Sequence, residues 1–477
     1  MAGKGQKKSA GRLTTAEEKA AARAAMAKEG LVGTDNPPVT IYKPGDNPGI
    51  DVADFVKPEE CEFQGFSLST GRMTSLADGL KSYGLEGVGG IIPCYAKIPT
   101  PDGFVRAERL EIGDCIFGAD GKPTKIMALD HLGWQSYIEF VLKDERTFQV
   151  AERSLVVTRR SYGHSTMRQY RRAIDMWETG ALKKRGYQFA VALGNPVEYP
   201  ESELPLHPYL MGILLGDGCR SDGGSLLLSS DDIQIADIMA RIVGAEHYCQ
   251  QQNCFTWRFY TGEVAGWKTN RRYYYGDMMK VKDVAPEYAK LLNHYAYEKW
   301  IPEEYLRSSI EQRLLLVCGL LDSEGTIAKA KKGAERFNVS FSSTSLQLAE
   351  GVQEIIRSLG GSAHLRIEKT PEKHGVNRNQ YAVMILVPPE MKKSLFLLPR
   401  KKEIAEEAAN YVPKKNYTKS PIIDCRRIEL SRPAVRIIVE RPDHLFIGEN
   451  FVVMHDGSFY NVEPGLDADC QYRQVIC

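Results

Sequence analysis

The sequence predicts a multidomain protein in which an all-β domain is divided into two sequence halves and an α/β domain is inserted between them. Short stretches of alternating apolar and polar residues, broken by tight-turn dipeptides, begin at Cys94 and recur from Arg426 to Asp456. Between them lies an internal repeat, in which an apolar helix ends in an acidic residue followed by glycine. Residues 1–93 show neither the alternating pattern nor the repeat, so we expect a partly disordered flank there.

The overall composition is that of an ordinary soluble protein. The 477 residues include 62 Lys and Arg against 61 Asp and Glu, so any nucleic-acid surface must be local. Ten cysteines have no regular spacing, and the closest pair, Cys249 and Cys254, has no matching second pair, which argues against a zinc site. With no signal peptide and no apolar run of membrane-spanning length, we expect a cytoplasmic protein without a membrane partner.

The repeat occurs in residues 210–218, LMGILLGDG, and again in residues 317–325, VCGLLDSEG. Each copy has glycine at its third position, Gly212 and Gly319, where two helix backbones can approach closely. Strands and a second helix follow each copy, which predicts an αββαββα architecture with pseudo-twofold symmetry. A buried helix that ends by chance in an acid and a glycine explains one copy, but not two copies in matching context.

The eighth position of each copy is acidic, Asp217 in the first and Glu324 in the second. If the two helices pack side by side, both carboxylates emerge together and repel each other unless a divalent cation lies between them. Two acids that share Mg²⁺ suit phosphodiester hydrolysis, with one acid serving each strand of a DNA duplex. The strands after each helix would form ribbons that fit the major groove.

Basic residues gather where such ribbons and their loops are expected. Solvated charge explains any one cluster, but three clusters in one domain favour phosphate contacts. The residues concerned are Arg271, Arg272, Lys331, Lys332, Lys401 and Lys402. A further basic segment, residues 159–187 with Arg171 and Arg172, is predicted to be a DNA-contacting arm, with a solvated helical linker as the alternative. Lys299 either places an ammonium group by the scissile phosphate or is simply exposed.

The two motifs, with KWIP before the second, resemble the paired motifs of double-motif LAGLIDADG homing endonucleases. The resemblance covers residues 205–405, and we assign residues 205–424 to this domain. It implies a monomeric enzyme that cleaves double-stranded DNA, with Mg²⁺ bound by Asp217 and Glu324 and with assistance from Lys299. Glu324 stands where aspartate is commoner, which changes the length of the ligand and not its chemistry.

The β segments on either side resemble the two halves of an intein splicing domain, the Hint fold. We assign the first half to residues 94–204 and the second to residues 425–456, which leaves residues 1–93 and 457–477 as flanks from a host protein. An endonuclease nested between such halves is the usual layout of a full-length intein. Neither flank contains a phosphate-binding loop, a metal-ligand spacing or a catalytic triad, and only association with other inteins points to a phage or nucleic-acid enzyme as host.

The resemblance also implies a splicing mechanism that needs no cofactor. The thiol of Cys94 attacks the carbonyl of Pro93 and converts the amide to a thioester. A downstream nucleophile receives the acyl group, and His455 assists Asp456 in cyclising, which releases the second flank. His444 stands at a further position where the family carries chemistry.

Several residues depart from the pattern of the splicing family. Ala151 and Ser154 replace the usual Thr and His, which removes the expected carbonyl clamp and proton donor of the first step. Arg436 stands where many members carry an acid, and its guanidinium would favour a thiolate at Cys94.

The downstream boundary departs as well, because Asp456 replaces the usual Asn and Gly457 cannot accept an acyl group. Three hypotheses remain. In the first, the element still splices, with Ser458 as acceptor and the boundary after Gly457. In the second, the splicing domain is degraded or cleaves at one end only, while the DNA endonuclease is retained. In the third, the match is one of fold alone, and the chain is a structural host protein with an inactive β insert.

Overall fold

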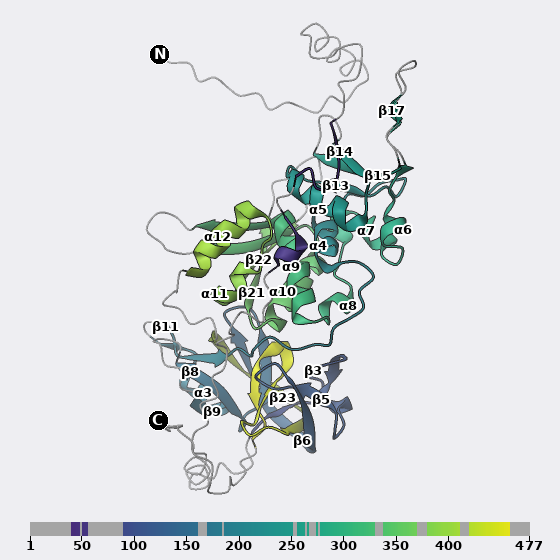
Figure 1. Ribbon diagram of the computed structural model, residues 1–477. Helices are drawn as coiled ribbons and strands as arrows, with labels where there is room; N and C mark the ends of the chain where they lie inside the picture. Colours follow the sequence, from purple (N-terminus) through teal and green to yellow (C-terminus); the bar gives the residue numbers. More distant parts are fainter. Residues whose placement is uncertain are drawn as a thin grey trace, which may run out of the picture.

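The computed structural model has two lobes, one made largely of strands and one that holds most of the helices (Figure 1). It describes residues 40–47, 50–55, 89–160, 169–183, 186–250, 255–262, 265–266, 273–274, 277–329, 337–369, 379–410 and 419–457. The strand-rich lobe, called the β domain, contains both predicted halves of the all-β domain. The other lobe is called the α/β domain. Within the described ranges, no helix is long and apolar enough to cross a membrane.

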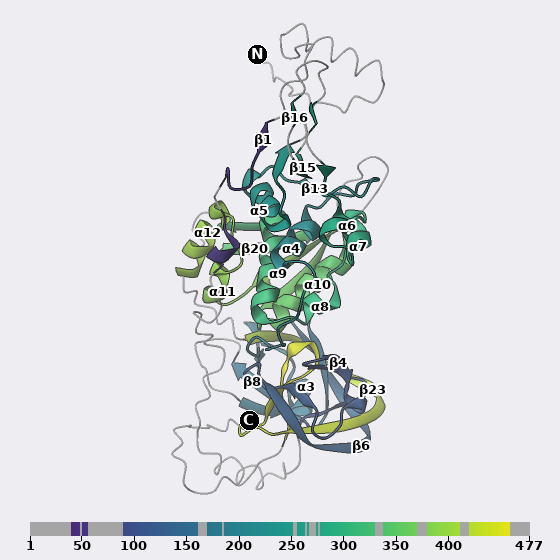
Figure 2. The same cartoon turned by 45° about the vertical axis from the view of Figure 1, so that its right-hand side comes forward.

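Two long strands hold the halves of the β domain together. β6 (Pro123–Leu142) comes from the first half and β23 (Lys419–Val439) from the second. They pair antiparallel along most of their length, with Ile422 opposite Leu142 at one end, and register shifts interrupt the ladder. Such irregularities let a long strand bend and twist, and Figure 2 shows the two strands curving along the lower lobe.

The other elements of the β domain are short. Its strands are β2 (Ile91–Pro93), β3 (Lys97–Thr100), β4 (Gly103–Arg106), β5 (Cys115–Phe117), β7 (Thr147–Ala151), β8 (Leu155–Arg160), β9 (Gln169–Arg172), β10 (Leu182–Lys183), β11 (Gly186–Tyr187), β12 (Phe189–Ala192), β24 (Leu445–Ile447) and β25 (Val453–His455). Its helices are η3 (Ala107–Arg109), α3 (Ala173–Thr179) and η5 (Glu449–Phe451). The main sheet has the order β5-β6-β23-β12-β8-β9, with β2 beside β23 and β7 beside β6.

Apolar side chains from both halves of the chain fill the interior of the β domain. Inward and outward residues alternate along β7 and the paired ends of β6 and β23, as the period of a strand requires. Residues of the core that are fully buried include Ile92, Ile98, Phe140, Leu142, Val435, Phe446 and Val452. Residues from both halves of the chain thus share one core, so residues distant in sequence must meet to complete the domain.

The α/β domain is built around two small sheets. Its helices are α4 (Pro208–Gly216), α5 (Ile233–Val243), α6 (Val281–Val284), α7 (Ala289–Leu292), η4 (Ala296–Glu298), α8 (Glu303–Leu306), α9 (Ile310–Glu324), α10 (Leu346–Ser358), α11 (Pro389–Lys393) and α12 (Pro399–Asn410). Its strands are β13 (Leu227–Ser229), β14 (His247–Gln250), β15 (Thr256–Thr261), β16 (Ala265–Gly266), β17 (Tyr273–Tyr274), β18 (Asp277–Met278), β19 (Gly325–Lys329), β20 (Phe337–Ser343), β21 (Ser362–Lys369) and β22 (Asn379–Leu386).

The two repeats differ in one respect from the predicted αββαββα pattern. In the second repeat, α9 is followed by β19, β20, α10, β21 and β22, and the four strands form a sheet of order β19-β20-β22-β21. In the first repeat, the strand directly after α4 is reduced to a single bridge between Gly218 and Leu228. The first repeat therefore has one regular strand between its two helices where the sequence predicts a pair.

The motif helices α4 and α9 touch at the glycines that the sequence singles out. A Cβ atom on Gly212 would lie 2.3 Å from the carbonyl oxygen of Leu316, and one on Gly319 would lie 2.1 Å from that of Tyr209. Any larger residue at either position would force the helices apart. This contact fixes where the last residues of both helices emerge.

A short segment of the upstream flank lies on the α/β domain. Strand β1 (Ile41–Tyr42) pairs antiparallel with β14, and η1 (Val52–Asp54) follows it. Ile50 and Phe55 are part of the apolar core of the α/β domain. The sequence predicts a partly disordered flank over residues 1–93, and the structure shows that the described residues of this stretch belong to the packed domain instead.

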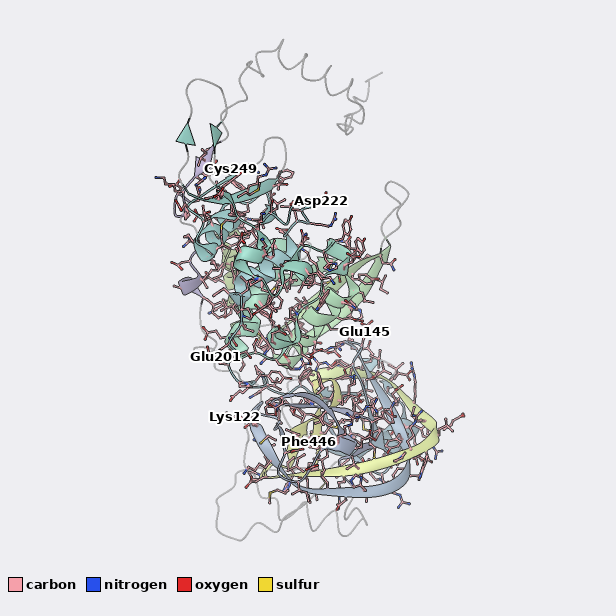
Figure 3. The ribbon with its side chains drawn as sticks, turned by 90° about the vertical axis from the view of Figure 1, so that its right-hand side faces the viewer. Lys122, Glu145, Glu201, Asp222, Cys249 and Phe446 are labelled. Atoms are coloured by element: carbon pink, nitrogen blue, oxygen red, sulfur yellow. The ribbon has the colours of Figure 1, made fainter. Side chains whose placement is uncertain are left out.

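The turn between β6 and β7 holds the two domains together. Arg146, which is fully buried, forms an ion pair with Asp144 at 3.0 Å. Its guanidinium also donates hydrogen bonds to the carbonyl oxygen of Gly361, in the α/β domain, and to that of Phe451 at 3.4 Å. Figure 3 shows Glu145 at this boundary. A single arginine therefore connects the α/β domain to η5, which leads to the end of the β domain.

Candidate functional site

The two motif acids meet where the paired helices end. Asp217 directly follows α4, and Glu324 is the last residue of α9. Burial, together with the charge of Glu324 and a hydrogen bond with it, raises the pKa of Asp217 to about 7. Carboxyl groups this close share a proton or bind a cation, because two adjacent negative charges repel each other.

A buried lysine closes the end of the first motif helix. The Nζ atom of Lys299 donates hydrogen bonds to the carbonyl oxygens of Leu214, at 2.7 Å, and Gly218, at 2.6 Å. Lys299 is fully buried, and burial lowers its pKa to about 8. Both carbonyls lie at the C-terminal end of α4, where the helix dipole makes a cation stabilising. The alternative that Lys299 is simply exposed is wrong.

A second buried lysine closes the end of the other motif helix. The Nζ atom of Lys401 donates hydrogen bonds at 2.7 Å to the carbonyl oxygens of Leu321 and Gly325. These are the fifth and ninth positions of the motif, the same two positions that Lys299 contacts in the first copy. Lys401 is buried, so its predicted role as a surface contact to DNA is wrong. Its neighbour Lys402 is partly exposed.

A buried aspartate fixes the segment that carries Lys401. The side chain of Asp322 accepts hydrogen bonds from the hydroxyl of Tyr209 at 2.9 Å and from the backbone N–H groups of Leu397, at 2.9 Å, and Leu398, at 3.2 Å. Burial raises the pKa of Asp322 to about 6. The start of α12 is thereby tied to the paired helices, which holds Lys401 beside the motif acids.

The other predicted DNA contacts are less well placed for that role. Arg271, Arg272, Lys331 and Lys332 lie outside the described residues. In the predicted basic arm, Arg172 forms an ion pair with Asp175, and the guanidinium of Arg171 lies 5.2 Å from the ring centre of Phe189. Both arginines belong to β9, which pairs with β8. The arm is therefore part of the β domain at these residues, and not a helical linker.

The downstream junction is held by a β-hairpin. β24 and β25 pair with Leu445 opposite His455. The Nδ1 atom of His455 accepts a hydrogen bond of 2.8 Å from the backbone N–H of Gly457. That nitrogen belongs to the Asp456–Gly457 peptide bond, so the imidazole lies next to the atom that must gain a proton when this bond breaks.

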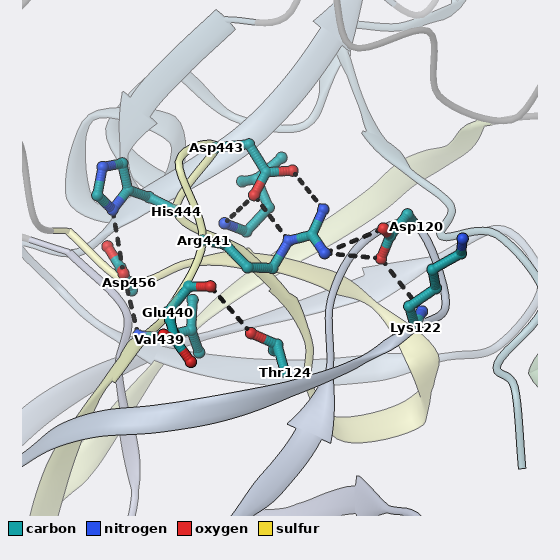
Figure 4. Close-up of polar contacts among 10 residues, drawn as sticks. Asp120, Lys122, Thr124, Val439, Glu440, Arg441, Asp443, His444 and Asp456 are labelled. Atoms are coloured by element: carbon teal, nitrogen blue, oxygen red, sulfur yellow. Dashed lines mark hydrogen bonds and ion pairs between the residues drawn. The ribbon is translucent and has the colours of Figure 1, made fainter. Parts of the chain in front are cut away.

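The carboxylate of Asp456 is buried and oriented by its neighbours (Figure 4). Its Oδ2 atom lies 3.3 Å from Nδ1 of His444 and accepts a hydrogen bond of 3.2 Å from the backbone N–H of Val439. His444 has a φ of +55°, a conformation that costs free energy in a residue with a side chain. The ion pair between Arg441 and Asp120, at 3.0 Å, closes the turn that carries His444.

The upstream flank reaches this hairpin through two glycines. A Cβ atom on Gly90 would lie 2.4 Å from the carbonyl oxygen of His455, and one on Gly89 would lie 2.0 Å from the Cα atom of Gly457. Gly90 also has a φ of +54°, in the left-handed region. Backbone is therefore packed against backbone, and the two flanks of the element lie in direct contact at the Asp456–Gly457 bond.

Cys94, the expected first nucleophile, forms its backbone hydrogen bonds with Pro433 and Glu108 and not with residues 455–457. Its N–H donates to the carbonyl oxygen of Pro433 at 3.0 Å, and its own carbonyl accepts from Glu108 at 2.9 Å. Partial burial, and then the charge of Glu108, raises the pKa of the Cys94 thiol. The expected thiolate-promoting effect of Arg436 is absent, because that guanidinium pairs with Asp130 at 2.9 Å.

The replacement for the usual histidine contacts a residue upstream of Cys94. The hydroxyl of Ser154 accepts a hydrogen bond from the N–H of Ile91 at 3.2 Å and donates one to the carbonyl of Ile91 at 3.3 Å. Ser154 stands where the splicing family has the histidine that serves the first step, and here it contacts Ile91 instead of Cys94. Sequence reasoning missed this position, although the Gly89-Gly90 pair that precedes it indicates close backbone contact.

Known proteins match the two parts of the chain differently. Residues 311–387, from α9 through β22, match the family described as LAGLIDADG-like domain. The homothallic switching endonuclease of Saccharomyces cerevisiae is 33% identical over 76 residues, which are 16% of this chain and 13% of that protein. Both matches are short, and the first falls on the second copy of the repeat.

A longer match extends over both domains. The replicative DNA helicase DnaB of Mycobacterium intracellulare is 26% identical over 401 residues, which are 80% of this chain and 60% of that protein. The chain thus spans less than two thirds of the length of either relative. Among solved structures, the crystal structure of the MchDnaB-1 intein is 26% identical, and that of the Msm DnaB1 intein splicing domain bound with zinc is 20% identical. Each covers 18% of this chain with a TM-score of 0.15, and the matches cover 60% and 62% of those chains.

The position of the LAGLIDADG match within the fold agrees with the predicted domain order. The matched residues lie in a domain that interrupts a β domain, and the two sequence halves of that β domain meet in one sheet. This nested order is the one that the splicing-domain and endonuclease motifs predict together. In this nested order and in sequence, the chain is therefore similar to inteins that carry a LAGLIDADG endonuclease domain.

Proposed function

We propose that the chain is a precursor that cleaves its own backbone at the Asp456–Gly457 bond and that also cleaves double-stranded DNA. The contact between the Gly89-Gly90 backbone and residues 455–457 carries the first activity, because it brings both flanks of the element to one buried place. The facing acids Asp217 and Glu324 carry the second.

Cleavage at the downstream junction needs only groups that already surround it. A carboxylate oxygen of Asp456 attacks the backbone carbonyl carbon of the same residue, and the bond to the nitrogen of Gly457 breaks. The imidazolium form of His455 supplies the proton that this nitrogen gains. The products are a free amino group on Gly457 and a cyclic anhydride at Asp456, which water opens to the free acid. His444 orients the attacking carboxylate by its contact with Oδ2.

The same geometry favours an upstream junction at the Gly90–Ile91 bond over the expected Pro93–Cys94 bond. Ile91 has no nucleophilic side chain, so a thioester at this bond cannot form from its own residue. Cleavage at the downstream end is therefore the reaction supported best. Complete splicing is the second candidate, favoured by the contact between the flanks. Because neither Ile91 nor Gly457 has a nucleophilic side chain, the amino group released on Gly457 would have to attack the carbonyl carbon of Gly90, with the nitrogen of Ile91 as leaving group.

Variants of the purified full chain test the self-cleavage on a denaturing gel and by intact mass. His455→Ala and Asp456→Ala should each abolish release of residues 457–477, because one removes the proton donor and the other the nucleophile. Ser458→Ala is the matched control, since it removes only the alternative acyl acceptor and should leave the release unchanged. Release at the wild-type rate from Asp456→Ala would refute the proposed step.

The acids at the ends of α4 and α9 would hold a divalent cation such as Mg²⁺. The fit is good, because carboxylate oxygens are the ligands Mg²⁺ prefers and a cation relieves the repulsion between Asp217 and Glu324. Within the described residues, no group of three or more His, Cys, Asp and Glu side chains surrounds a common point, so phosphate oxygens of the DNA would complete the coordination. When bound, the cation stabilises charge at the scissile phosphate. Lys299 and Lys401 then place two positive charges beside the acids.

A supercoiled plasmid that carries the uninterrupted host gene tests the endonuclease. The wild-type chain should linearise it in the presence of Mg²⁺ and not in the presence of a chelator. Asp217→Asn and Glu324→Gln should each lower the rate by at least about a hundredfold, as removal of groups that act on the transition state does. Asp222→Asn is the control, because this nearby acid is almost fully exposed. Equal cutting by all four proteins would contradict the assignment.

A further inference from the structure

The upstream flank adds an edge strand to the endonuclease domain. Ile41 pairs with Cys249 and Tyr42 with Tyr248, so β1 extends the sheet formed by β13, β14 and β15 (Figures 1 and 2). The Tyr42 ring stacks on that of Tyr248, with ring centres 5.5 Å apart, and lies 6.0 Å from that of Trp257. An added strand gains backbone hydrogen bonds from the sheet edge and specificity from its side chains, which is a common mode of peptide recognition.

A buried carboxylate receives the turn that follows this strand. Asp237 lies on α5, is completely buried, and accepts a hydrogen bond of 2.9 Å from the backbone N–H of Gly45. The same oxygen accepts from the hydroxyl of Tyr248 at 2.8 Å, and that hydroxyl accepts from the side chain of Asn47 at 3.1 Å. The other oxygen of Asp237 pairs with Arg241 at 3.1 Å. One buried acid thus organises the contacts to the flank.

Apolar anchors complete the contact. Ile50 is 3% exposed and Phe55 is 9% exposed, and both pack in the same core as α4 and α9. Arg241 donates a hydrogen bond to the carbonyl oxygen of Ile50 and lies 3.8 Å from the carboxylate of Asp51. The flank is therefore held by a strand, a turn and two side chains, in the manner of a bound peptide with anchor residues.

We propose that the endonuclease domain carries a peptide-binding site whose ligand is the host segment upstream of the element, held through residues 40–47 and 50–55. This inference rests on the proposed function in one respect, namely that those residues leave with the host when the element is released. The site itself stays on the endonuclease domain, because Asp237, Arg241, Tyr248 and Trp257 all belong to it. The freed element consequently keeps an affinity for its own host protein.

The test uses the full chain with a protease recognition sequence inserted between residues 57 and 88, in a His455→Ala background so that self-cleavage plays no part. After cutting, the fragment that contains residues 40–55 should co-elute with the remainder in gel filtration at micromolar concentration. A labelled synthetic peptide of residues 38–57 should exchange with it. Once the fragment is removed, the remainder should stay folded by circular dichroism and bind the peptide again.

Two substitutions in the flank and one control sharpen this experiment. Ile50→Asp places a charge in an apolar site. Gly45→Pro removes the N–H group that donates a hydrogen bond to Asp237. Each substitution should weaken peptide binding at least about tenfold. Lys43→Ala, at an exposed position two residues before Gly45, should bind as the wild type does. Separation of the wild-type fragment at micromolar concentration, unfolding of the remainder on its removal, or equal binding by Ile50→Asp would each overturn the proposal. Because self-cleavage is blocked throughout, none of these results depends on the splicing reaction.

Discussion

The backbone of Gly90 lies against the carbonyl oxygen of His455, so the two ends of the element meet one residue before Ile91. A substitution at Gly90 therefore acts directly on the downstream junction. Gly90→Ala should slow cleavage at Asp456–Gly457 at least about tenfold, because a Cβ atom 2.4 Å from that oxygen forces the backbones apart and the φ of +54° is strained for alanine. The rate of release of residues 457–477, followed by mass spectrometry, measures this effect.

Gly133→Ala is the matched control for that prediction. Gly133 has a similar φ of +65° but faces open space, so it carries the same conformational strain without the contact. A comparable loss of cleavage in both variants would show that backbone strain, and not the contact with His455, is responsible.

Lys401 and Lys402 should behave differently although they are adjacent. Lys401→Met leaves three buried carbonyl oxygens without their donor, which should lower the free energy of unfolding by about 2–4 kcal/mol and abolish DNA cleavage. Lys402→Met should change stability by less than about 0.5 kcal/mol, as substitutions of partly exposed residues do. Chemical denaturation and the plasmid assay measure the two effects. If Lys401 acted by contacting DNA, its replacement would instead flatten the salt dependence of binding.

Arg146 should transmit changes between the domains. Arg146→Leu leaves Asp144 buried without its ion-pair partner, which should cost about 3–5 kcal/mol, and it frees the carbonyl oxygen of Phe451 near the downstream junction. We therefore expect slower cleavage at Asp456–Gly457 as well as lower stability. Glu145→Ala is the control, because its contact with His364 at 3.5 Å is half exposed and is worth at most about 1 kcal/mol. An unchanged cleavage rate in Arg146→Leu would show that η5 is positioned by other contacts.

The thiol of Cys94 should be poorly reactive at neutral pH. Partial burial, and then the charge of Glu108, raise the pKa of this thiol above its usual value, so at a given pH less of it is in the nucleophilic thiolate form than for a free cysteine. Alkylation by iodoacetamide should be slower than for a free cysteine at pH 8 and should still be accelerating above pH 9. Peptide mass spectrometry across this pH range measures it. Fast labelling at pH 7 would indicate an activated thiol and restore the expected role of Cys94.

The sequence predicts those features of the fold and the site that depend on residues close together in the chain. Gly212 and Asp217 belong to one motif, at α4, and Gly319 and Glu324 to the other, at α9. The spacing within each motif therefore indicates how its glycine and its acid are placed. Lys401 was misinterpreted because its partners are carbonyl oxygens of a helix that lies far from it in sequence. Its one available signal was the pseudo-twofold repeat, which requires a mate for Lys299.

The upstream junction and the flank were harder to predict from the sequence, because their contacts also join residues that are far apart in the chain. Cys94 is conspicuous as a nucleophile, whereas Gly89 and Gly90 show their role only when the end of the chain packs against them. Residues 40–55 read as linker because Pro and Gly break their pattern, yet backbone pairing with β14 and two apolar anchors, Ile50 and Phe55, suffice to fix them. Long-range backbone contacts leave almost no trace in local composition.

Tandem mass spectrometry of the products formed by the purified wild-type chain tests the central claim most directly. The released downstream product should begin at Gly457, and any joined product should contain Gly90 followed directly by Gly457. A joined product in which Pro93 precedes Gly457 or Ser458, a downstream fragment that begins at Ser458, or a chain that stays intact on prolonged incubation would contradict the account.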